Sequence, residues 1–598
     1  MMSKGTVIPP DSGYIKPQAR APHDPNVAFE EYHYYAQKTR EEEDSLQSPK
    51  LNIRQLISRK KNTQGNNTDE NPTATLTEKD YANVENRREI SDEEWANASR
   101  ALRTASTGAC ELIVTTQRET PEKGNLLIHY SFIRKGFYLI TTDVLGPYGS
   151  AFAMGIALYT VFGFMAGYSG YLVWRVFLGV DSHQFPARNY GDIAFRTWGS
   201  TVRYITNLMQ AIALLLLIGQ VTIQFGENIS QVSKFRLCYA VCPVLFVCVG
   251  FFVSQIRTLR SFGWIANFAV WANLLVIFIS MGVIAHSSPN FAISTLGSAG
   301  SAVNPDTITP VDGKYPPVMH YSGLPPNGLV GSINGLLSAV LAYAGIQLFV
   351  EFMAEMRRPR DFIKAMWGAQ FFVYSVYLIY GCFVYHYQGQ YSFNPSYQGV
   401  SIYSWQTVGN MISLISALIA AGLYGNIGVK VVYNNVFMDL FRAPPLTTKL
   451  GKVIYAILVP IFWVIAFIIA AAIPDYFGFV SVMSASMLLN MTYTLPPLFA
   501  LGFDIQKNAV RIEDGEGFDP NTGRVIRQES TVQRWVRGFW SGGAFQVAIN
   551  IWHVLYLLAS LAMSGLGMYA AIEGMIEAFK IPELNSFSCT SPLDLSSS

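Results

Sequence analysis

The chain has 598 residues, of which 50% are hydrophobic and only 14% are charged, so it is too apolar to be a string of soluble domains. Its formal net charge of +2 gives no indication of a nucleic-acid partner. The histidines are scattered, without an HExxH pattern or a Cys/His cluster that would indicate a metal site. These features indicate a protein embedded in a lipid bilayer.

The first part of the chain, residues 1–122, is polar and carries short charge runs such as Glu41 to Asp44. It offers too little apolar surface to offset the entropy of an ordered chain, so we expect it to be disordered. Residues 123–580 form the expected membrane domain, and residues 581–598 form a short tail.

Long apolar runs fill the membrane domain, and each can cross about 30 Å of hydrocarbon at 1.5 Å per residue. We predict an all-α polytopic membrane protein with eleven transmembrane helices. Their approximate ranges are 136–155, 157–178, 201–225, 235–256, 263–285, 331–352, 363–387, 404–430, 452–473, 475–502 and 545–578.

The basic residues alternate between the two sets of loops. One set is rich in Lys and Arg, from Arg134 and Lys135 before the first helix to the run between Lys507 and Arg537. Cationic residues near helix ends accumulate on the cytoplasmic side, which predicts a cytoplasmic N-terminus and a non-cytoplasmic tail. The sequon that begins at Asn228 would then face the non-cytoplasmic side, where it is an available glycosylation acceptor.

Three of the six cysteines, Cys238, Cys242 and Cys248, lie in one apolar run between Phe235 and Ile256. A disulfide framework is not expected inside such a run, so we interpret them as small packing residues. A metal site is the alternative, but no His or carboxylate lies among them.

Two of the predicted helices are interrupted. Helix one contains Asp143, Gly146, Pro147 and Gly149 near its middle, and helix six contains the stretch Ala342-Tyr343-Ala344-Gly345-Ile346-Gln347. The two breaks are five helices apart, and a repeat of five helices enters the membrane from the opposite side the second time. This arithmetic predicts two inverted repeats, about 136–285 and 331–502, with an extra helix at about 545–578.

Broken helices expose backbone N–H and C=O groups. The positive end of a half-helix can hold a carboxylate and freed carbonyls can hold an ammonium group, so a zwitterion fits such a pair of breaks. The alternative is that the breaks only kink the helices or allow close packing, as expected for Gly163, Gly167 and Gly170 in helix two.

Ionisable residues inside the membrane are candidates for function, because an unpaired charge there costs several kcal/mol. Asp143 could carry a coupling proton or bind an amino group, or it could simply accept hydrogen bonds from the freed amides. Glu351, beyond the second break, is the second proton-coupling candidate, unless it pairs with a cation at the cytoplasmic face. We expect Lys430 to snorkel to the cytoplasmic surface. Helix three supplies further polar residues, which line a polar path or join helices: Gln210, Gln220 and Gln224.

The second break carries a family resemblance. Ala342-Tyr343-Ala344-Gly345, followed by Phe349-Val350-Glu351 and then Glu355-Met356-Arg357-Arg358-Pro359-Arg360-Asp361-Phe362, resembles the sixth-helix signature of the amino acid/auxin permease family. That signature reads roughly F-A-Y-S-G-x-x-x-F-P-E-I, then S-E-M-K-N-P-K-D-F-x-K-A. Asn189-Tyr190-Gly191-Asp192 and Leu145-Gly146-Pro147-Tyr148 are similar to its loop between helices two and three and its first break.

The resemblance implies a LeuT-like core of two inverted five-helix repeats and proton-coupled symport of amino acids. It places substrate contacts on two sets of residues, Thr142, Asp143, Val144, Leu145 and Gly146 in helix one and Tyr343, Ala344 and Gly345 in helix six. The chain departs from the family at Asp143, where a small residue is more usual, and at Val350, where Pro is usual.

The combined interpretation is an amino acid permease of the fungal neutral or aromatic type that works by alternating access. Its partners would be the amino acid and the bilayer, with no nucleic acid, no cofactor beyond a proton or sodium gradient, and a monomeric state. The plasma membrane is favoured over the vacuole. The alternatives are a non-transporting amino acid sensor that signals through its N-terminal segment and a vacuolar exporter. We do not expect an enzyme, because no convincing set of paired acids or nucleophile and base lies within the helices.

Overall fold

The structure, a computed structural model, describes residues 26–45, 152–255, 259–294, 310–320, 328–355, 359–393, 395–438, 441–444, 446, 448–473, 476–580 and 587–594. The helices in the predicted membrane domain are α8 (Phe152–Val180), α10 (Ser200–Val232), α11 (Val241–Ser254), α12 (Leu259–His286), α14 (Gly328–Ala342), α15 (Phe349–Glu355), α16 (Phe362–Gln388), α17 (Tyr403–Val432), α18 (Lys449–Ala471), α19 (Tyr476–Met483), α20 (Leu495–Asn508) and α22 (Gly543–Lys580).

Shorter elements connect or precede these helices. They are α1 (Phe29–Ser45), α9 (Tyr190–Trp198), α13 (Phe291–Ser294) and α21 (Thr531–Trp540), the 3-10 helices η4 (Ile346–Leu348), η5 (Pro359–Asp361) and η6 (Gly389–Tyr391), and the π-helices η7 (Tyr433–Met438), η8 (Ser484–Leu488) and η9 (Asn490–Thr494). Strands β1 (Gly517–Asp519) and β2 (Arg524–Ile526) pair antiparallel, with Phe518 opposite Val525.

The predicted all-α polytopic fold is confirmed. Every predicted span after the first has a helical counterpart, and in the described ranges seven helices are long and apolar enough to cross a membrane individually. One boundary prediction is wrong, because α8 begins at Phe152 and runs without interruption through the turn expected at 155–157. The sequence there, Phe152 to Leu158, is continuously apolar apart from one glycine, so nothing local stops the helix. The rest of the first predicted span, 136–151, lies outside the described residues.

The centre of the helical domain is formed by α10 and α17. The two helices pack against each other, and α10 also packs against α18. The faces in contact carry small or branched side chains such as Leu214, Ile218 and Ala421, all fully buried. Gly219 permits a close approach of α10 to α18, because a Cβ at that position would lie 2.8 Å from the carbonyl oxygen of Ala466. These helices form a rigid frame beside the interrupted sixth helix.

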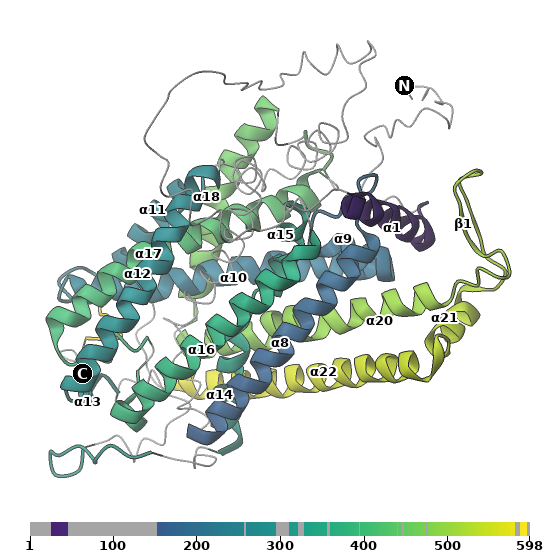
Figure 1. The fold of residues 1–598 in the computed structure, drawn as a ribbon. Helices are drawn as coiled ribbons and strands as arrows, with labels where there is room; N and C mark the ends of the chain where they lie inside the picture. The colour runs from purple at the N-terminus through teal and green to yellow at the C-terminus, as the bar shows by residue number, and fades with distance from the viewer. Residues whose placement is uncertain are drawn as a thin grey trace, which may run out of the picture.

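Loops that the positive-inside rule assigns to the same side gather at the same end of the molecule. Figure 1 shows α1, α9, α21 and the β1–β2 hairpin at the right-hand end, all from segments predicted to be cytoplasmic, while α13 lies near the opposite end. We call these the α1 end and the α13 end.

The prediction that residues 1–122 are disordered is wrong for Phe29–Ser45, which form α1. Overall polarity concealed an amphipathic pattern, in which Phe29, Tyr32, Ala36 and Arg40 recur at helical spacing and are all buried. Two glutamates in the first turn also favour a helix, because they complement its positive end. The remainder of residues 1–122 lies outside the described residues, apart from Asn26–Ala28.

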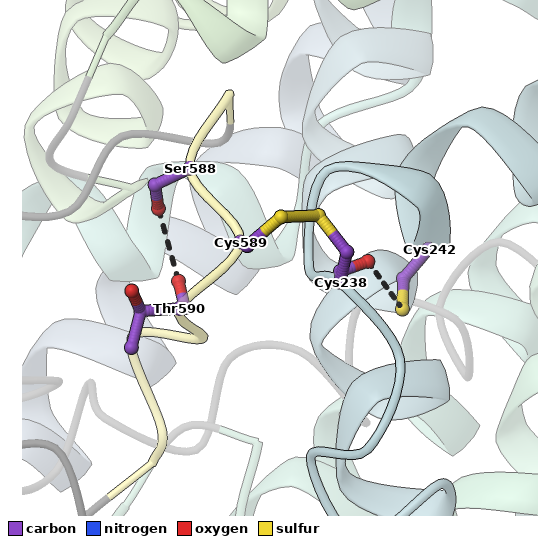
Figure 2. The surroundings of a disulfide bond; sticks show 5 residues. All are labelled: Cys238, Cys242, Ser588, Cys589 and Thr590. Atoms are coloured by element: carbon purple, nitrogen blue, oxygen red, sulfur yellow. Dashed lines mark hydrogen bonds between the residues drawn. A yellow bond between two sulfur atoms is a disulfide. The ribbon is translucent and has the colours of Figure 1, made fainter.

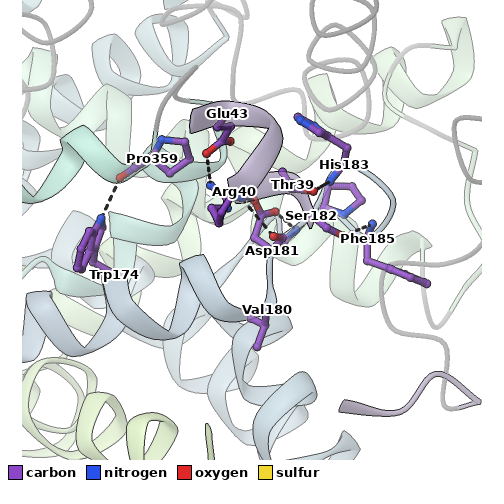
Figure 3. A network of polar contacts seen from close by, with 12 residues as sticks. Thr39, Arg40, Glu43, Trp174, Val180, Asp181, Ser182, His183, Phe185 and Pro359 are labelled. Carbon is purple, nitrogen blue, oxygen red and sulfur yellow. Dashed lines mark hydrogen bonds and ion pairs between the residues drawn. The ribbon is translucent and has the colours of Figure 1, made fainter. Parts of the chain in front are cut away.

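Polar contacts fix α1 against the end of α8. Arg40 donates hydrogen bonds to the Asp181 carboxylate at 2.9 Å and to Glu43 at 2.8 Å, and the Thr39 hydroxyl accepts one from the backbone N–H of His183 (Figure 3). Asp181 also accepts a hydrogen bond from the backbone of Ala187, so it stabilises the α8–α9 loop as well. Close by, the Trp174 indole N–H donates to the carbonyl of Pro359, which joins α8 to the start of η5.

The α13 end carries a disulfide that the sequence interpretation excluded. Cys238 and Cys589 are bonded, 351 residues apart in sequence (Figure 2). The exclusion was wrong because Cys238 precedes α11, which begins at Val241, and so lies in a loop instead of inside the apolar helix. The tail runs alongside this loop, where the backbone N–H of Tyr239 donates to the carbonyl of Cys589. Cys242 and Cys248 remain free thiols.

Asn228 is not available for glycosylation in this structure. It lies inside α10 with 1% of its surface exposed, and its amide donates to the Tyr397 hydroxyl and accepts a hydrogen bond from Gln398. The prediction failed because α10 continues to Val232, beyond the predicted end at 225, so that Asn228 lies within the helix and not in the loop after it.

Candidate functional site

The predicted break in helix six is present. α14 ends at Ala342, the backbone from Tyr343 to Gly345 is not helical, and the chain resumes as η4 and then α15. Gly345 has a φ of 138°, a conformation that residues with a Cβ rarely adopt, so glycine is required at this point. The break therefore follows from the local sequence.

Two side chains from neighbouring helices bind carbonyls freed by the break. The Tyr377 hydroxyl on α16 donates to the carbonyl of Ala342 at 3.1 Å, and the Gln210 amide on α10 donates to the carbonyl of Gln347 at 3.0 Å. Buried carbonyls without a partner are costly, and these two bonds satisfy them from both sides of the break. The open conformation of helix six is thus held by α10 and α16.

Glu351 lies next to this arrangement. Its carboxylate accepts a hydrogen bond from the Gln210 amide at 2.8 Å, and only 9% of its surface is exposed. One glutamine therefore contacts both the break and the acidic residue beyond it.

Lys430 on α17 is buried, with 4% of its surface exposed, so the prediction that it snorkels to the surface is wrong.

Tyr343, inside the break, packs among aromatic rings. Its ring centroid lies 6.0 Å from that of Tyr159 and 5.6 Å from that of Tyr377. A Cβ on Gly163 of α8 would lie 3.0 Å from the Tyr343 ring, so glycine at this position gives the ring its room. The expected packing glycine of helix two therefore packs against the break itself.

A second irregular segment faces the break. Predicted helix ten contains two π-helices, η8 and η9, and η9 packs against η4. The irregular turns are held by the Tyr190 hydroxyl, which donates to the carbonyl of Met491, and by the Tyr493 hydroxyl, which donates to the carbonyl of Phe162 on α8. π-helical turns are rare and occur frequently at functional sites.

Several buried polar atoms around the break have no hydrogen-bond partner within the described part of the chain. They are the hydroxyls of Tyr343 and Thr492 and the side-chain carbonyl oxygens of Gln210 and Gln347. Such atoms are normally satisfied in folded proteins. Hydroxyls, amide oxygens and a carboxylate such as that of Glu351 are the kinds of group that accept hydrogen bonds from an ammonium group.

The predicted site residues fall into two groups. Tyr343, Ala344, Gly345 and Glu351 lie together at the break, whereas Thr142, Asp143, Val144, Leu145 and Gly146 lie outside the described residues. Sequence reasoning identified Gln210 only as one of several polar residues, and it missed Gln347, Tyr377 and Thr492. A polar residue in an apolar helix was the available indication for these.

Residues 152–509 match the family model described as "Transmembrane amino acid transporter protein". A "Transmembrane transporter" of Gibberella moniliformis (strain M3125 / FGSC 7600) is 23% identical over 314 residues, which cover 52% of this chain and 60% of that protein. A "Transmembrane transporter" of Fusarium pseudograminearum (strain CS3096) is 22% identical over 277 residues, covering 45% of this chain and 54% of that protein. The chain thus spans between half and two thirds of the length of these relatives.

Two solved transporter structures align with much of this chain at low identity. Mhp1, a nucleobase-cation-symport-1 family transporter in a closed conformation with bromovinylhydantoin bound, aligns with a TM-score of 0.40 and 12% identity over 76% of this chain and 92% of that chain. A Na+-coupled sialic acid symporter in a substrate-bound outward-open state aligns with a TM-score of 0.42 and 14% identity over 82% of this chain and 98% of that chain.

Proposed function

We propose that this chain, which belongs to the transmembrane amino acid transporter protein family, carries neutral or aromatic amino acids across a membrane together with protons. The observation that carries the proposal is the opened helix six, with the buried Glu351 carboxylate next to freed peptide groups. Such a site suits a zwitterion, because its ammonium group finds carbonyl oxygens and its carboxylate finds the positive end of a half-helix. We propose substrate contacts at Tyr343, Ala344 and Gly345, and from helix one at Thr142, Asp143, Val144, Leu145 and Gly146.

The proposed mechanism is alternating access with two proton-coupling acids, Asp143 and Glu351. Gln210 supports this role for Glu351, because its side-chain amide nitrogen donates one hydrogen bond to the Glu351 carboxylate and another to the Gln347 carbonyl at the break. Binding of a proton or of substrate would change this shared contact, so the two events would be coupled.

The disulfide supports an orientation. Disulfides persist in oxidising compartments, so the α13 end, which carries Cys238–Cys589, would face the outside or a lumen. The α1 end would then face the cytoplasm, which agrees with the basic loops. We propose the plasma membrane as the location.

The test is uptake of a panel of labelled amino acids into vesicles that contain the full chain, with and without a pH gradient. We expect concentrative uptake of neutral or aromatic amino acids only when the outside is more acidic. Asp143→Asn and Glu351→Gln should abolish the effect of the gradient, whereas Glu513→Gln, an exposed acid near the hairpin, should not change it.

Other results would replace the proposal. Uptake driven by a sodium gradient alone would show that the coupling ion is sodium and not the proton. Saturable binding of an amino acid without any uptake would identify a sensor. Absence of both binding and uptake for the whole panel would exclude amino acids as the substrate.

A further inference from the structure

A buried cluster of ionisable side chains lies away from the break, between α8, α20 and α22. Arg175 on α8 donates a hydrogen bond to the Asp504 carboxylate on α20 at 2.6 Å. His553 on α22 lies beside this pair, with its Nδ1 atom 3.8 Å from the same carboxylate oxygen. Its other ring nitrogen, Nε2, lies 3.1 Å from the Tyr168 hydroxyl. The cluster thus joins three helices that are far apart in sequence.

Burial differs sharply between the three charged or chargeable groups. The side chain of His553 is 1% exposed and that of Asp504 is 5% exposed, whereas that of Arg175 is 26% exposed. Arg175 and Asp504 lie within a few residues of the ends of their helices at Val180 and Asn508, on the α1 end. The arginine is therefore the member of the cluster that can exchange its partner for water on that side.

The surroundings of His553 fit a protonated imidazole. A protonated ring has two N–H donors, and here one nitrogen faces a phenol oxygen and the other faces a carboxylate. At 3.8 Å the second contact is too long to be a hydrogen bond, and Nδ1 has no partner within the described ranges. In the tautomer in which Nε2 carries the ring proton and donates it to the Tyr168 hydroxyl, Nδ1 is the nitrogen left to bind a second proton, and it faces Asp504.

The other groups that face His553 complete its electrostatic environment. Tyr168 and Arg175 on α8 and Asp504 on α20 lie next to the ring, Lys507 interacts with Asp504, and Tyr171 and Tyr556 interact with Tyr168. Asp504 also accepts a hydrogen bond from Gln546, and Tyr168 contacts Trp552. Asp504 is the one carboxylate in this set, so Arg175 and a protonated His553 would compete for it.

We propose that His553 is a proton-binding site that controls the Arg175–Asp504 ion pair and, through it, the contact between α8 and α20. A proton from the aqueous phase at the α1 end binds the free ring nitrogen, and the resulting N–H donates to Asp504. Arg175 then turns toward water, which frees the end of α8 from α20. Loss of the proton to the same aqueous phase restores the ion pair.

The inference rests on the proposed transport function, but it concerns a different proton. Asp143 and Glu351 would bind the proton that travels with substrate, whereas His553 would bind a proton from the cytoplasmic side and change the transport rate. A rate effect leaves the final accumulation ratio unchanged, because that ratio depends only on the gradient and the stoichiometry.

The test compares the wild type with His553→Gln, a side chain that does not titrate and retains hydrogen-bonding atoms. Exchange of labelled for unlabelled substrate is measured in vesicles with equal pH on both sides, between about pH 3.5 and pH 8. The wild-type rate should change by about fivefold or more across this range, the lower end of common coupling effects, and the variant rate should change clearly less. Gradient-driven accumulation should be the same for both. The control is His286→Gln, an exposed histidine near the α13 end.

A second measurement needs no transport. The melting temperature of the purified protein is recorded against pH for both forms, and the difference between them should vary with pH if His553 titrates in the folded state. Arg175→Gln should reproduce the released state and make the exchange rate less dependent on pH. Identical pH profiles of exchange for wild type and His553→Gln, or a melting difference that is constant with pH, would overturn the inference. If the wild type transports nothing, the proposed function fails, and the melting profiles alone decide the role of His553.

Discussion

Glu30, in the first turn of α1, accepts two hydrogen bonds from the guanidinium of Arg527, which follows it by 497 residues, at 3.0 and 2.7 Å. Arg534 on α21 pairs with the same carboxylate. The Glu30 side chain is 3% exposed, so this is a buried acidic group held by two cations. A segment near the start of the chain is thereby fastened to the segment between α20 and α22.

Glu30→Gln should release α1 from its contacts with Arg527 and Arg534. The substitution leaves Arg534, whose side chain is 8% exposed, without its carboxylate, and breaking a buried ion pair costs about 3–5 kcal/mol. We expect faster limited proteolysis between residues 26 and 45, detected by mass spectrometry of the fragments. Glu41→Gln, an exposed acid on the same helix, is the matched control. Equal cleavage rates in all three proteins would contradict a stabilising role for Glu30.

The same pair should make the protein sensitive to acid. Burial raises the pKa of Glu30, but its contacts with Arg527 and Arg534 outweigh burial and hold the pKa below the ordinary value of 4.5. A carboxylate with a lowered pKa stabilises the folded state fully above its unfolded pKa, and this contribution is lost as the pH falls through the folded value. The difference in melting temperature between wild type and Glu30→Gln should therefore be constant above about pH 5 and shrink below it. A difference that persists unchanged in stronger acid would contradict this assignment.

Cys589→Ser should lower the stability of the protein without affecting insertion. The Cys238–Cys589 bond closes a loop of 351 residues, and removal of a native disulfide typically costs about 2–5 kcal/mol. A reductant should lower the melting temperature of the wild type to that of the variant and leave the variant unchanged. Cys248→Ser, which removes an exposed free thiol, is the control. If an impermeant reductant applied to intact cells fails to reduce this disulfide, the α13 end does not face the outside at the plasma membrane as proposed.

Tyr377→Phe should reduce transport by altering the break. The substitution removes the hydroxyl that binds the Ala342 carbonyl, and an unsatisfied buried acceptor costs about 1–3 kcal/mol, which is about thirtyfold in rate at the middle of that range. We expect kcat/KM for uptake to fall while the amount of protein in the membrane stays constant. Tyr387→Phe changes an exposed tyrosine on the same helix and should have no effect. A similar loss in both variants would point to damage of α16 in general.

The sequence by itself determined the features that depend on short stretches of chain. The predicted spans after the first have helical counterparts because the length of an apolar run is a local property. The break in helix six was located because Gly345 permits a backbone angle that other residues avoid. Tyr343, Ala344 and Glu351 followed from that position. The average polarity of residues 1–122 predicted disorder, but α1 within this segment has a small buried face that the average does not show.

Only the tertiary structure decided which distant residues meet. Gln210 contacts Glu351 across 141 residues, and Cys238 bonds Cys589 across 351. The polar residues of α10, such as Asn207, Gln210 and Gln224, recur at helical spacing and mark its buried side, but the sequence does not show which neighbouring helix that side meets. Those contacts depend on how all the helices pack together at once, and they place polar side chains such as Tyr377 and Thr492 around the break.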